Sequence, residues 1–377
     1  MAEYKTLVKK IPISPDKKTK QKDYLKKGQL PIVDQGQSLV GGYTDDANMT
    51  VECELPVIVF GDHTRAVKYI TFPFGAGADG IKVLQPKENI LPPFLYYGTQ
   101  YIVAKMPNRG YARHYQYVEK EDLPVPSLPE QERIVARIEE LFSQLDAGVE
   151  TLKKTKAQLS VYRQAAITEA FSVENNTPNV CLSDIAQIIG GITKGRDLSG
   201  TETIELPYLR VANVQNGYLD LSEIKTIKLR VDEKERYLLK PGDVLYTEGG
   251  DRDKLGRGTV WRGEIKDCVH QNHVFKARVD QSKAIPEYVA FWSMSTPARN
   301  YFYQKGKQSV NLASINKTVL SALTMPLPAL EKQREIINHI ESRLSVCDSI
   351  EQTVDIALQQ AEAMRQSILK NAFEGNL

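Results

Sequence analysis

The sequence has few cysteines and no long apolar run, and both absences exclude classes of protein. The four cysteines lie far apart and form no Cys-x-x-Cys motif, which argues against a zinc knuckle and against a disulfide framework. No apolar stretch approaches the roughly 20 residues that span a bilayer. Met1–Lys5 does not resemble a signal peptide, so we expect a cytoplasmic protein with reduced thiols and no membrane contact.

An excess of charge of either sign is also missing. The 49 lysines and arginines and the 47 aspartates and glutamates leave a net charge of +2, which excludes a uniformly basic surface. Local basic patches remain compatible with that sum. A hydrophobic content of 41% with 25% charged residues predicts a soluble chain that forms a core, and 377 residues predict two or three domains.

Motifs for nucleotide chemistry are absent or incomplete. The Gly-x-x-x-x-Gly-Lys-Ser/Thr motif does not occur, which argues against ATP-driven work by this chain. Gly75–Gly80 matches Gly-x-Gly-x-x-Gly, but a strand-like run follows it where a pyrophosphate site needs a helix, so we interpret it as a turn. Leu91–Phe94 is similar to the Asn/Asp-Pro-Pro-Tyr/Phe loop of adenine methyltransferases. Leu91 stands where that loop needs a polar group, which argues against methylation by this chain.

Two further patterns match a nuclease or a zinc site only loosely, and a self-contained nuclease stays as a third hypothesis. Asp243, Glu264 and Lys266 loosely match the acidic-lysine spacing of metal-dependent nucleases, although Pro-Gly before Asp243 is typical of a turn that enters a strand. His270 and His273 lie three residues apart on a strand-like segment, which would place them on opposite faces. We therefore predict a noncatalytic chain that holds neither a metal nor a cofactor.

The strongest feature that is present is an internal repeat. Residues 126–171 align without a gap on residues 328–373 at an offset of 202, and 14 of the 46 aligned pairs are identical. Each copy follows a proline-rich segment and carries apolar residues at alternating spacings of four and three, which predicts a long helix. About 40 helical residues make a rod roughly 60 Å long.

Two such helices in one chain predict an antiparallel pair, although a homodimeric coiled coil, with each helix pairing with another chain, stays open. The residues predicted to lie along the seam are Ile134, Ile138, Leu141, Leu145, Leu152, Leu159, Ile336, Ile340, Ile350, Val354 and Ile368.

A β-rich segment precedes each helix. Strand-like runs separated by Gly and Pro turns occur at Val57–Phe60, Ile81–Leu84, Gly242–Tyr246 and His273–Val279. We predict an α+β fold in which two β-rich domains, residues 1–125 and 172–327, are joined by two long antiparallel coiled-coil helices, residues 126–171 and 328–377, in a pseudo-two-fold repeat. Leu30–Ile32 matches Leu206–Tyr208 at an offset of 176, so the first domain is shorter by 202 − 176 = 26 residues.

The two helical segments carry a family signature. Leu128–Val135 reads LPEQERIV and runs into a helix that ends RQAAITEAF at Arg163–Phe171, and the second copy reads LEKQREII at Leu330–Ile337 and RQSILKNAFEG at Arg365–Gly375. These segments resemble the spacer helices of the specificity (S) subunit of type I restriction-modification systems. The resemblance covers essentially the whole chain, because the β-rich segments lie where that family has its two target-recognition domains.

The resemblance implies a function and a set of partners. Such a subunit reads a bipartite target in double-stranded DNA, with one half-site for each target-recognition domain. It carries no chemistry and binds two methyltransferase (M) subunits, and through them restriction-translocase (R) subunits. S-adenosylmethionine, ATP and Mg²⁺ are then expected on the partner subunits and not on this chain.

Basic and amide side chains near glycines, at matching places in the two repeats, are the candidate DNA contacts, since such side chains read base edges and phosphates. The predicted contacts are His63, Arg65, Lys68, Asn108, Arg109, Tyr111, Arg113, His114, Arg252, Lys254, Arg257, Lys305, Lys307, Gln308 and Asn311. The first 27 residues also hold nine lysines, which could bind phosphate. Solvated loops remain the alternative for these residues, and a coiled-coil scaffold that does not read sequence remains the alternative for the whole chain.

Overall fold

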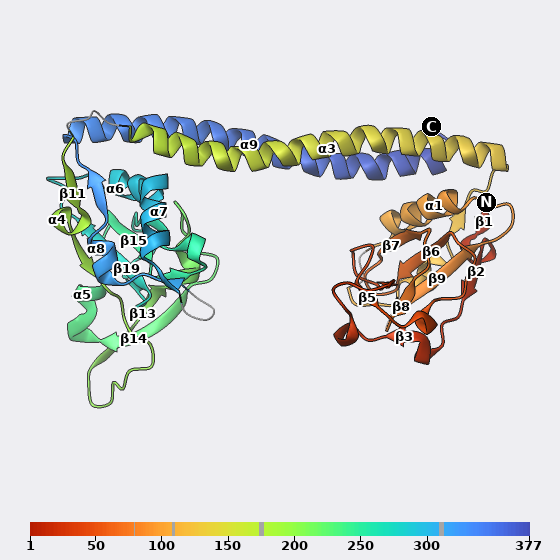
Figure 1. The fold of residues 1–377 in the computed structure, drawn as a ribbon, viewed down its shortest axis with the longest axis horizontal. Helices are drawn as coiled ribbons and strands as arrows, with labels where there is room; N and C mark the ends of the chain where they lie inside the picture. The colour runs from red at the N-terminus through yellow and green to blue at the C-terminus, as the bar shows by residue number, and fades with distance from the viewer. Residues whose placement is uncertain (79, 108–109, 173–176, 309–312) are drawn as a thin grey trace. The chain divides into compact units, whose positions relative to one another are not determined.

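The chain divides into two compact units. The computed structural model describes residues 1–78, 80–107, 110–172, 177–308 and 313–377 (Figure 1). Unit 1 consists of Met1–Lys153 and Asp355–Leu377, and unit 2 consists of Lys154–Val354. Each unit therefore contains the first part of one long helix and the last part of the other. Asn108, Arg109 and Asn311, three of the predicted DNA contacts, lie outside the described residues.

The repeat forms the two long helices that the sequence predicts, α3 (Leu128–Ala170) and α9 (Leu330–Phe373). Proline occurs in α3 only in the first turn, where its missing N–H has no intrahelical partner to lose. None of the helices in the described part of the chain is both long enough and apolar enough to span a bilayer.

The two helices run antiparallel within each unit. In unit 1 the guanidinium of Arg365 on α9 pairs with Asp146 on α3, and Arg133, near the start of α3, donates to the carbonyl of Leu377 at 3.1 Å. In unit 2 Arg343 pairs with Glu169 at 2.7 Å. The predicted antiparallel pairing within one chain is thereby confirmed.

Most of the predicted seam residues are buried or half-buried, but Ile350 is 40% exposed, so its place in the seam was predicted wrongly. On α9 the buried positions recur every seven residues, at Cys347, Val354 and Ala361. The fully buried part of the contact stripe there is one residue per heptad, with half-buried residues such as Leu344 and Ala357 between, and Ile350 lies outside it. The fully or largely buried seam residues are Ile134, Ile138, Leu159, Ile336, Ile340 and Val354, and the half-buried ones are Leu141, Leu145, Leu152 and Ile368.

Unit 1 is built on two four-stranded sheets. The first has the order β2-β9-β6-β7 with antiparallel pairing, and the second has the order β3-β8-β4-β5. Its strands are β1 (Ala2–Glu3), β2 (Val8–Ile11), β3 (Lys18–Thr19), β4 (Leu30–Val33), β5 (Gly42–Thr44), β6 (Val57–Gly61), β7 (Val67–Ile70), β8 (Gly75–Gly77), β9 (Ile81–Pro86) and β10 (Asp122–Leu123), and its short helices are α1 (Pro92–Lys105) and α2 (Tyr115–Val118). The central strand β6 is buried along its whole length, as its unbroken apolar run requires.

Unit 2 repeats the four-stranded main sheet of unit 1, and its second sheet has three strands instead of four. Its main sheet has the order β12-β19-β15-β17, its second sheet has the order β14-β13-β18, and a small third sheet has the order β16-β21-β20. Its strands are β11 (Asn179–Cys181), β12 (Ala186–Ile189), β13 (Thr203–Leu209), β14 (Lys225–Arg230), β15 (Asp243–Thr247), β16 (Gly249–Gly250), β17 (Gly258–Val260), β18 (Val269–His270), β19 (Val274–Val279), β20 (Lys307–Gln308), β21 (Ala313–Ser314) and β22 (Thr324–Pro326). Its helices are α4 (Leu182–Ile185), α5 (Lys234–Tyr237), α6 (Pro286–Met294), α7 (Thr296–Lys305) and α8 (Lys317–Ser321).

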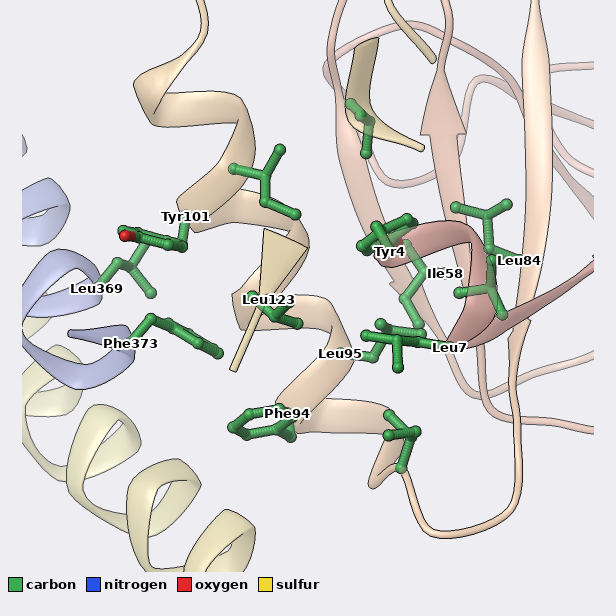
Figure 2. Packing of buried hydrophobic residues seen from close by; sticks show 14 of the residues in the cluster. Tyr4, Leu7, Ile58, Leu84, Phe94, Leu95, Tyr101, Leu123, Leu369 and Phe373 are labelled. Atoms are coloured by element: carbon green, nitrogen blue, oxygen red, sulfur yellow. The ribbon is translucent and has the colours of Figure 1, made fainter. Parts of the chain in front are cut away.

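In unit 1 the end of α9 completes the core. Phe373 lies with its ring centroid 5.1 Å from that of Phe94 and 5.3 Å from that of Tyr101, both on α1 (Figure 2). All three side chains belong to one buried cluster with residues of the main sheet and of the first turns of α3. The domain core therefore includes a residue that is about 270 positions away in the sequence from its neighbours.

The end of α3 has the same place in unit 2. Phe171 lies edge-on to Tyr288 and to Trp292, both on α6, with ring centroids 5.2 Å apart in each case. Phe171 and Phe373 are equivalent in the repeat, and so are Tyr288 and Phe94 at an offset of 194. Each β-rich domain is thus packed against the start of one long helix and the end of the other.

We predict that Phe373→Ala lowers the free energy of unfolding by about 3–5 kcal/mol, because it removes a buried ring and leaves a cavity. The residue is 5% exposed, so little of the cavity opens to solvent. Urea unfolding of the full chain measures the loss, and Val161→Ala, at a position on α3 that is 71% exposed, is the control. A loss below about 1 kcal/mol would show that the ring does not pack as described.

Candidate nucleic-acid interface

In unit 1 the loop after β6 and the segment before α2 are joined by hydrogen bonds. The backbone N–H of His114 donates to the carbonyl of Asp62 at 2.8 Å, and that of Tyr115 donates to the Asp62 carboxylate at 2.8 Å. The ring of His63 stacks on that of Tyr111 with centroids 4.3 Å apart, and its Nδ1 lies 3.1 Å from the carbonyl of Ala112. Two segments that the sequence predicts separately as DNA contacts therefore form one surface.

The exposed part of this surface is aromatic and basic. Tyr111 is 85% exposed, and Arg113 is exposed beside it. Arg65 is half-buried, has a φ of 61°, and donates to the carbonyl of Met106 at 3.3 Å. Gly80 has a φ of 69° and packs against His63, because a Cβ at this position would lie 3.0 Å from the His63 ring. An exposed ring next to an arginine is suited to contact a nucleic acid.

Two predicted contact residues of unit 1 lie in the interior. Lys68 is 5% exposed, and its amine donates to the backbone carbonyl of Asp34 at 2.7 Å and lies 3.5 Å from the Asp34 carboxylate. Burial lowers the pKa of Lys68, and Asp34 opposes this shift. His114 is 0% exposed, with Nδ1 3.0 Å from the carbonyl of Asp62. Both side chains are buried and face backbone carbonyls. The prediction that Lys68 and His114 contact DNA was therefore wrong, and the two residues stabilise the loops that carry the surface.

Unit 2 joins the equivalent segments in the same way. The backbone N–H of Ile315 donates to the carbonyl of Glu248, which follows β15 as Asp62 follows β6, at 2.8 Å. The Glu248 carboxylate lies 2.6 Å from Nδ1 of His273. Gly249 and Gly250 form β16, which pairs with β21. The segment before β22 therefore returns to the loop after β15, as the segment before β10 returns to the loop after β6 in unit 1.

Arginine and lysine side chains border this second surface. Arg252 lies over the ring of Tyr303 at 4.5 Å and donates from Nε to the carbonyl of Tyr303 at 3.1 Å. Lys254 forms an ion pair with Asp251, and Arg257 donates to the side-chain oxygen of Gln215 at 3.2 Å. Two further predicted contacts, Lys305 and Lys307, are exposed, and Gln308 follows in β20.

Sequence reasoning missed two residues of these surfaces. Tyr303 is 50% exposed, and its ring lies under the guanidinium of Arg252. Its position two residues before the predicted contact Lys305 could have indicated it. Gln35 follows β4, and its Oε1 would lie 2.5 Å from a Cβ at Gly80. Nothing in the local sequence brings Gln35 to the loop after β6, because the contact depends on the pairing of distant strands.

The basic N-terminal segment borders a cavity of about 620 Å³ in unit 1. Lys18, Lys20 and Tyr24 line it together with Gln35 and Thr64. The cavity therefore connects the lysine-rich segment to the loop after β6. Lysines at this place could contact phosphate, as the sequence predicts.

The residues of the nuclease and zinc alternatives have structural partners. Asp243 is 1% exposed and accepts from Nε and Nη2 of Arg278, each at 2.8 Å. His270 is 0% exposed, and burial lowers its pKa to about 4. His273 lies instead beside Glu248. Within the described ranges, no group of three or more His, Cys, Asp or Glu side chains is arranged to hold a metal ion.

Comparison with known families decides the class of the chain. Residues 10–160 and 175–360 match the family described as the type I restriction modification DNA specificity domain, once for each repeat. The chain belongs to this family. The family is one of DNA specificity domains, which confirms the predicted resemblance.

Named relatives and solved structures agree with the family. The StySPI specificity subunit of Salmonella potsdam is 27% identical over 274 residues, which are 68% of this chain and 58% of that relative. This chain thus spans 58% of the length of that relative. A chain from a study of complex assembly and conformational transition of the type I R-M system matches with a TM-score of 0.68 and 17% identity, over 100% of this chain and 97% of that chain. The HsdS subunit from Thermoanaerobacter tengcongensis matches with a TM-score of 0.51 and 17% identity, over 100% and 96%. These two structures confirm the predicted fold.

The burial of Lys68 and the exposure of Arg113 give a paired prediction. Lys68→Met is expected to lower the free energy of unfolding by about 1–3 kcal/mol, because the backbone carbonyl and the half-buried carboxylate of Asp34 lose their buried donor. The DNA affinity of the Lys68→Met variant should depend on salt as that of the wild type does, since the Lys68 amine binds Asp34 and does not face a phosphate. Arg113→Ala is expected to leave the stability unchanged and to make the salt slope shallower by about 1.

Urea unfolding and DNA binding at several salt concentrations measure both effects of this pair. A shallower salt slope for Lys68→Met, with the stability unchanged, would contradict the buried position of its amine.

Proposed function

We propose that this chain reads a bipartite DNA target, with one half-site for each unit, and that it does so as the noncatalytic specificity component of a type I restriction-modification complex. The observation that carries the proposal is the same pair of loops in both units. Asp62 accepts from His114 in unit 1, and Glu248 accepts from Ile315 in unit 2, each at 2.8 Å. Exposed basic side chains lie on these loops in both units, with an exposed tyrosine on the loop in unit 1 (Tyr111) and on the neighbouring α7 in unit 2 (Tyr303).

The chemistry of these surfaces supports sequence reading. One domain reaches only a few base pairs of the major groove, so two domains with separate surfaces suit a target in two parts. Arg252 and Arg113 can contact guanine edges or phosphates, and the tyrosines beside them supply rigid contact area. The lysines of the first 27 residues, several of them exposed, supply phosphate contacts that fix orientation. The long helices would then set the number of base pairs that lie unread between the half-sites.

Surfaces on the helix pair support the docking of two methyltransferase subunits. In unit 1 Arg365 pairs with Asp146 and lies 4.2 Å from the ring of Phe142. Phe142 meets Tyr97 of α1 edge-on at 5.7 Å. A cavity of about 410 Å³, lined by these four residues and by Glu139, lies beside the pair.

The equivalent surface of unit 2 has the same plan. Arg163 pairs with Asp348 at 2.7 Å and with Glu351 at 2.9 Å. A cavity of about 910 Å³ is lined by Arg163 and Asp348 and by Leu344 and Phe291, which correspond to Phe142 and Tyr97. Two equivalent surfaces are suited to bind two copies of the same partner. Restriction-translocase subunits would then join through the methyltransferases.

The remaining chemistry belongs to the partners in this proposal. S-adenosylmethionine is placed on the methyltransferase subunits, and ATP and Mg²⁺ are placed on the restriction-translocase subunits. The complex would act on DNA in the cytoplasm. The assignment of chemistry to the partners is supported by Asp243, the acidic residue of the nuclease-like pattern. Its carboxylate forms an ion pair with Arg278 and so has a structural role.

The proposal predicts that Tyr111→Ala and Arg252→Ala each affect one half-site only. In the reconstituted complex with its methyltransferase, each variant should lose about 1–3 kcal/mol of discrimination, or roughly 5- to 150-fold, at one half of the target and none at the other. Mapping N6-methyladenine in DNA exposed to each complex measures this. Arg137→Ala, at an exposed arginine of α3 that pairs with Glu140, is the control and should keep both half-sites.

Two results would overturn the proposal. If the wild-type complex binds every duplex with the same affinity, the chain is a scaffold that does not read sequence. If both variants change the same half-site, the units do not read separate parts of the target.

A further inference from the structure

A buried glutamine joins three segments at the start of α3. Gln131 is 0% exposed, and each polar atom of its side chain has a backbone partner. Its Oε1 accepts from the N–H of Leu91 at 2.9 Å, and its Nε2 donates to the carbonyls of Asn89 and Pro126, each at 2.9 Å. These partners lie in the turn before α1, at the start of α1, and in the proline-rich segment before α3.

The second repeat has the same arrangement. Gln333 is 0% exposed, and its Oε1 accepts from the N–H of Ile285 at 2.9 Å. Its Nε2 donates to the carbonyls of Lys283 at 3.1 Å and Pro328 at 2.8 Å. The partners correspond one by one, at an offset of 194 for the residues before α1 and α6 and of 202 for those of the helix repeat. The same three hydrogen bonds are thus kept in two domains with different surrounding sequences.

The chemistry of these junctions requires an amide side chain. Pro92 is the first residue of α1 and Pro286 the first residue of α6, and neither has a backbone N–H to donate. The preceding residues, Leu91 and Ile285, have no side chain that could cap the helix. One side chain must therefore accept one bond and donate two, and Gln offers both groups at the required length. A glutamate at this place would lack the donors, and a methionine would lack donors and acceptor.

The consequence concerns the direction in which each long helix leaves its domain. The glutamine lies in the first turn of the helix, while its partners belong to the domain, so the three bonds fix the rotation and tilt of the helix on the domain. A helix of 43 residues is about 65 Å long. A change of tilt of about 5° at its start moves the far end of such a helix by about 6 Å, nearly two base-pair steps of about 3.4 Å.

We propose that Gln131 and Gln333 are positioning residues that set the separation of the two DNA half-sites. They touch no DNA, and they act through the angle between each domain and its helix. The inference rests on the proposed reading of a bipartite target. It assigns to these two glutamines the selectivity for one separation, which is distinct from the selectivity for base sequence at each half-site.

Gln131→Met and Gln333→Met test this proposal in the complete complex with the methyltransferase. The substrates are duplexes with both half-sites at the natural separation, or at separations one and two base pairs shorter or longer. The wild-type complex is expected to methylate one separation. Each variant is expected to raise the relative rate at the neighbouring separations by about tenfold or more, while the half-site sequences that are methylated stay the same.

Two controls separate positioning from a loss of stability. Gln158→Met makes the same change at an exposed position of α3 and should keep the single separation. Val59→Ala, in the core of the sheet at 0% exposure and away from the junction, should lower the unfolding temperature without widening the range of separations.

The outcomes distinguish this inference from the proposed function. If either glutamine variant stays folded and keeps the wild-type separation, or if Val59→Ala widens the range as much, the positioning role is overturned while bipartite reading stands. If the wild-type complex accepts every separation equally, bipartite reading itself is overturned, and the inference fails with it.

Discussion

The structure depends on a phenylalanine that each repeat places in the domain of the other. Phe373, at the end of α9, packs on α1 of unit 1, and Phe171, at the end of α3, packs on α6 of unit 2. Neither domain core is complete without the helix end that comes from the other half of the sequence. The antiparallel direction of the helices follows, because only that direction brings each helix end back to the domain beside the start of the other helix.

Two of the identical pairs in the repeat lie where the long helices meet the domains. Phe171 and Phe373 occupy equivalent positions in the cores of the two units, and Gln131 and Gln333 make equivalent sets of three hydrogen bonds to the backbone. The seam is less uniform, as Leu145 on α3 corresponds to Cys347 on α9. Packing between two helices tolerates changes of volume that are compensated across the contact. A hydrogen-bonding pattern around prolines tolerates none, because only an amide satisfies it.

The sequence predicts much of the architecture and only part of the surfaces. The repeat, the long helices and the buried strand β6 follow from periodicity and from an unbroken apolar run. Lys68 could not be assigned to the interior, because its partner Asp34 is 34 residues away and meets it only after the sheets form. His114 is buried for a similar reason, since its segment folds back on Asp62. The exposure of Ile350 follows from the narrow contact stripe, which a heptad pattern does not reveal.

The near-neutral charge of the chain fits a protein that discriminates between DNA sequences. Several cations of the loop regions are already neutralised locally, as in the pairs of Lys254 with Asp251 and of Lys17 with Glu52. Phosphate attraction does not depend on sequence, so a strongly basic surface would bind every duplex. A chain with a net charge of +2 gains less from that attraction. Under the proposed function, its affinity must then come mainly from contacts that differ between base sequences and from half-sites at the correct separation, and both terms reject incorrect DNA.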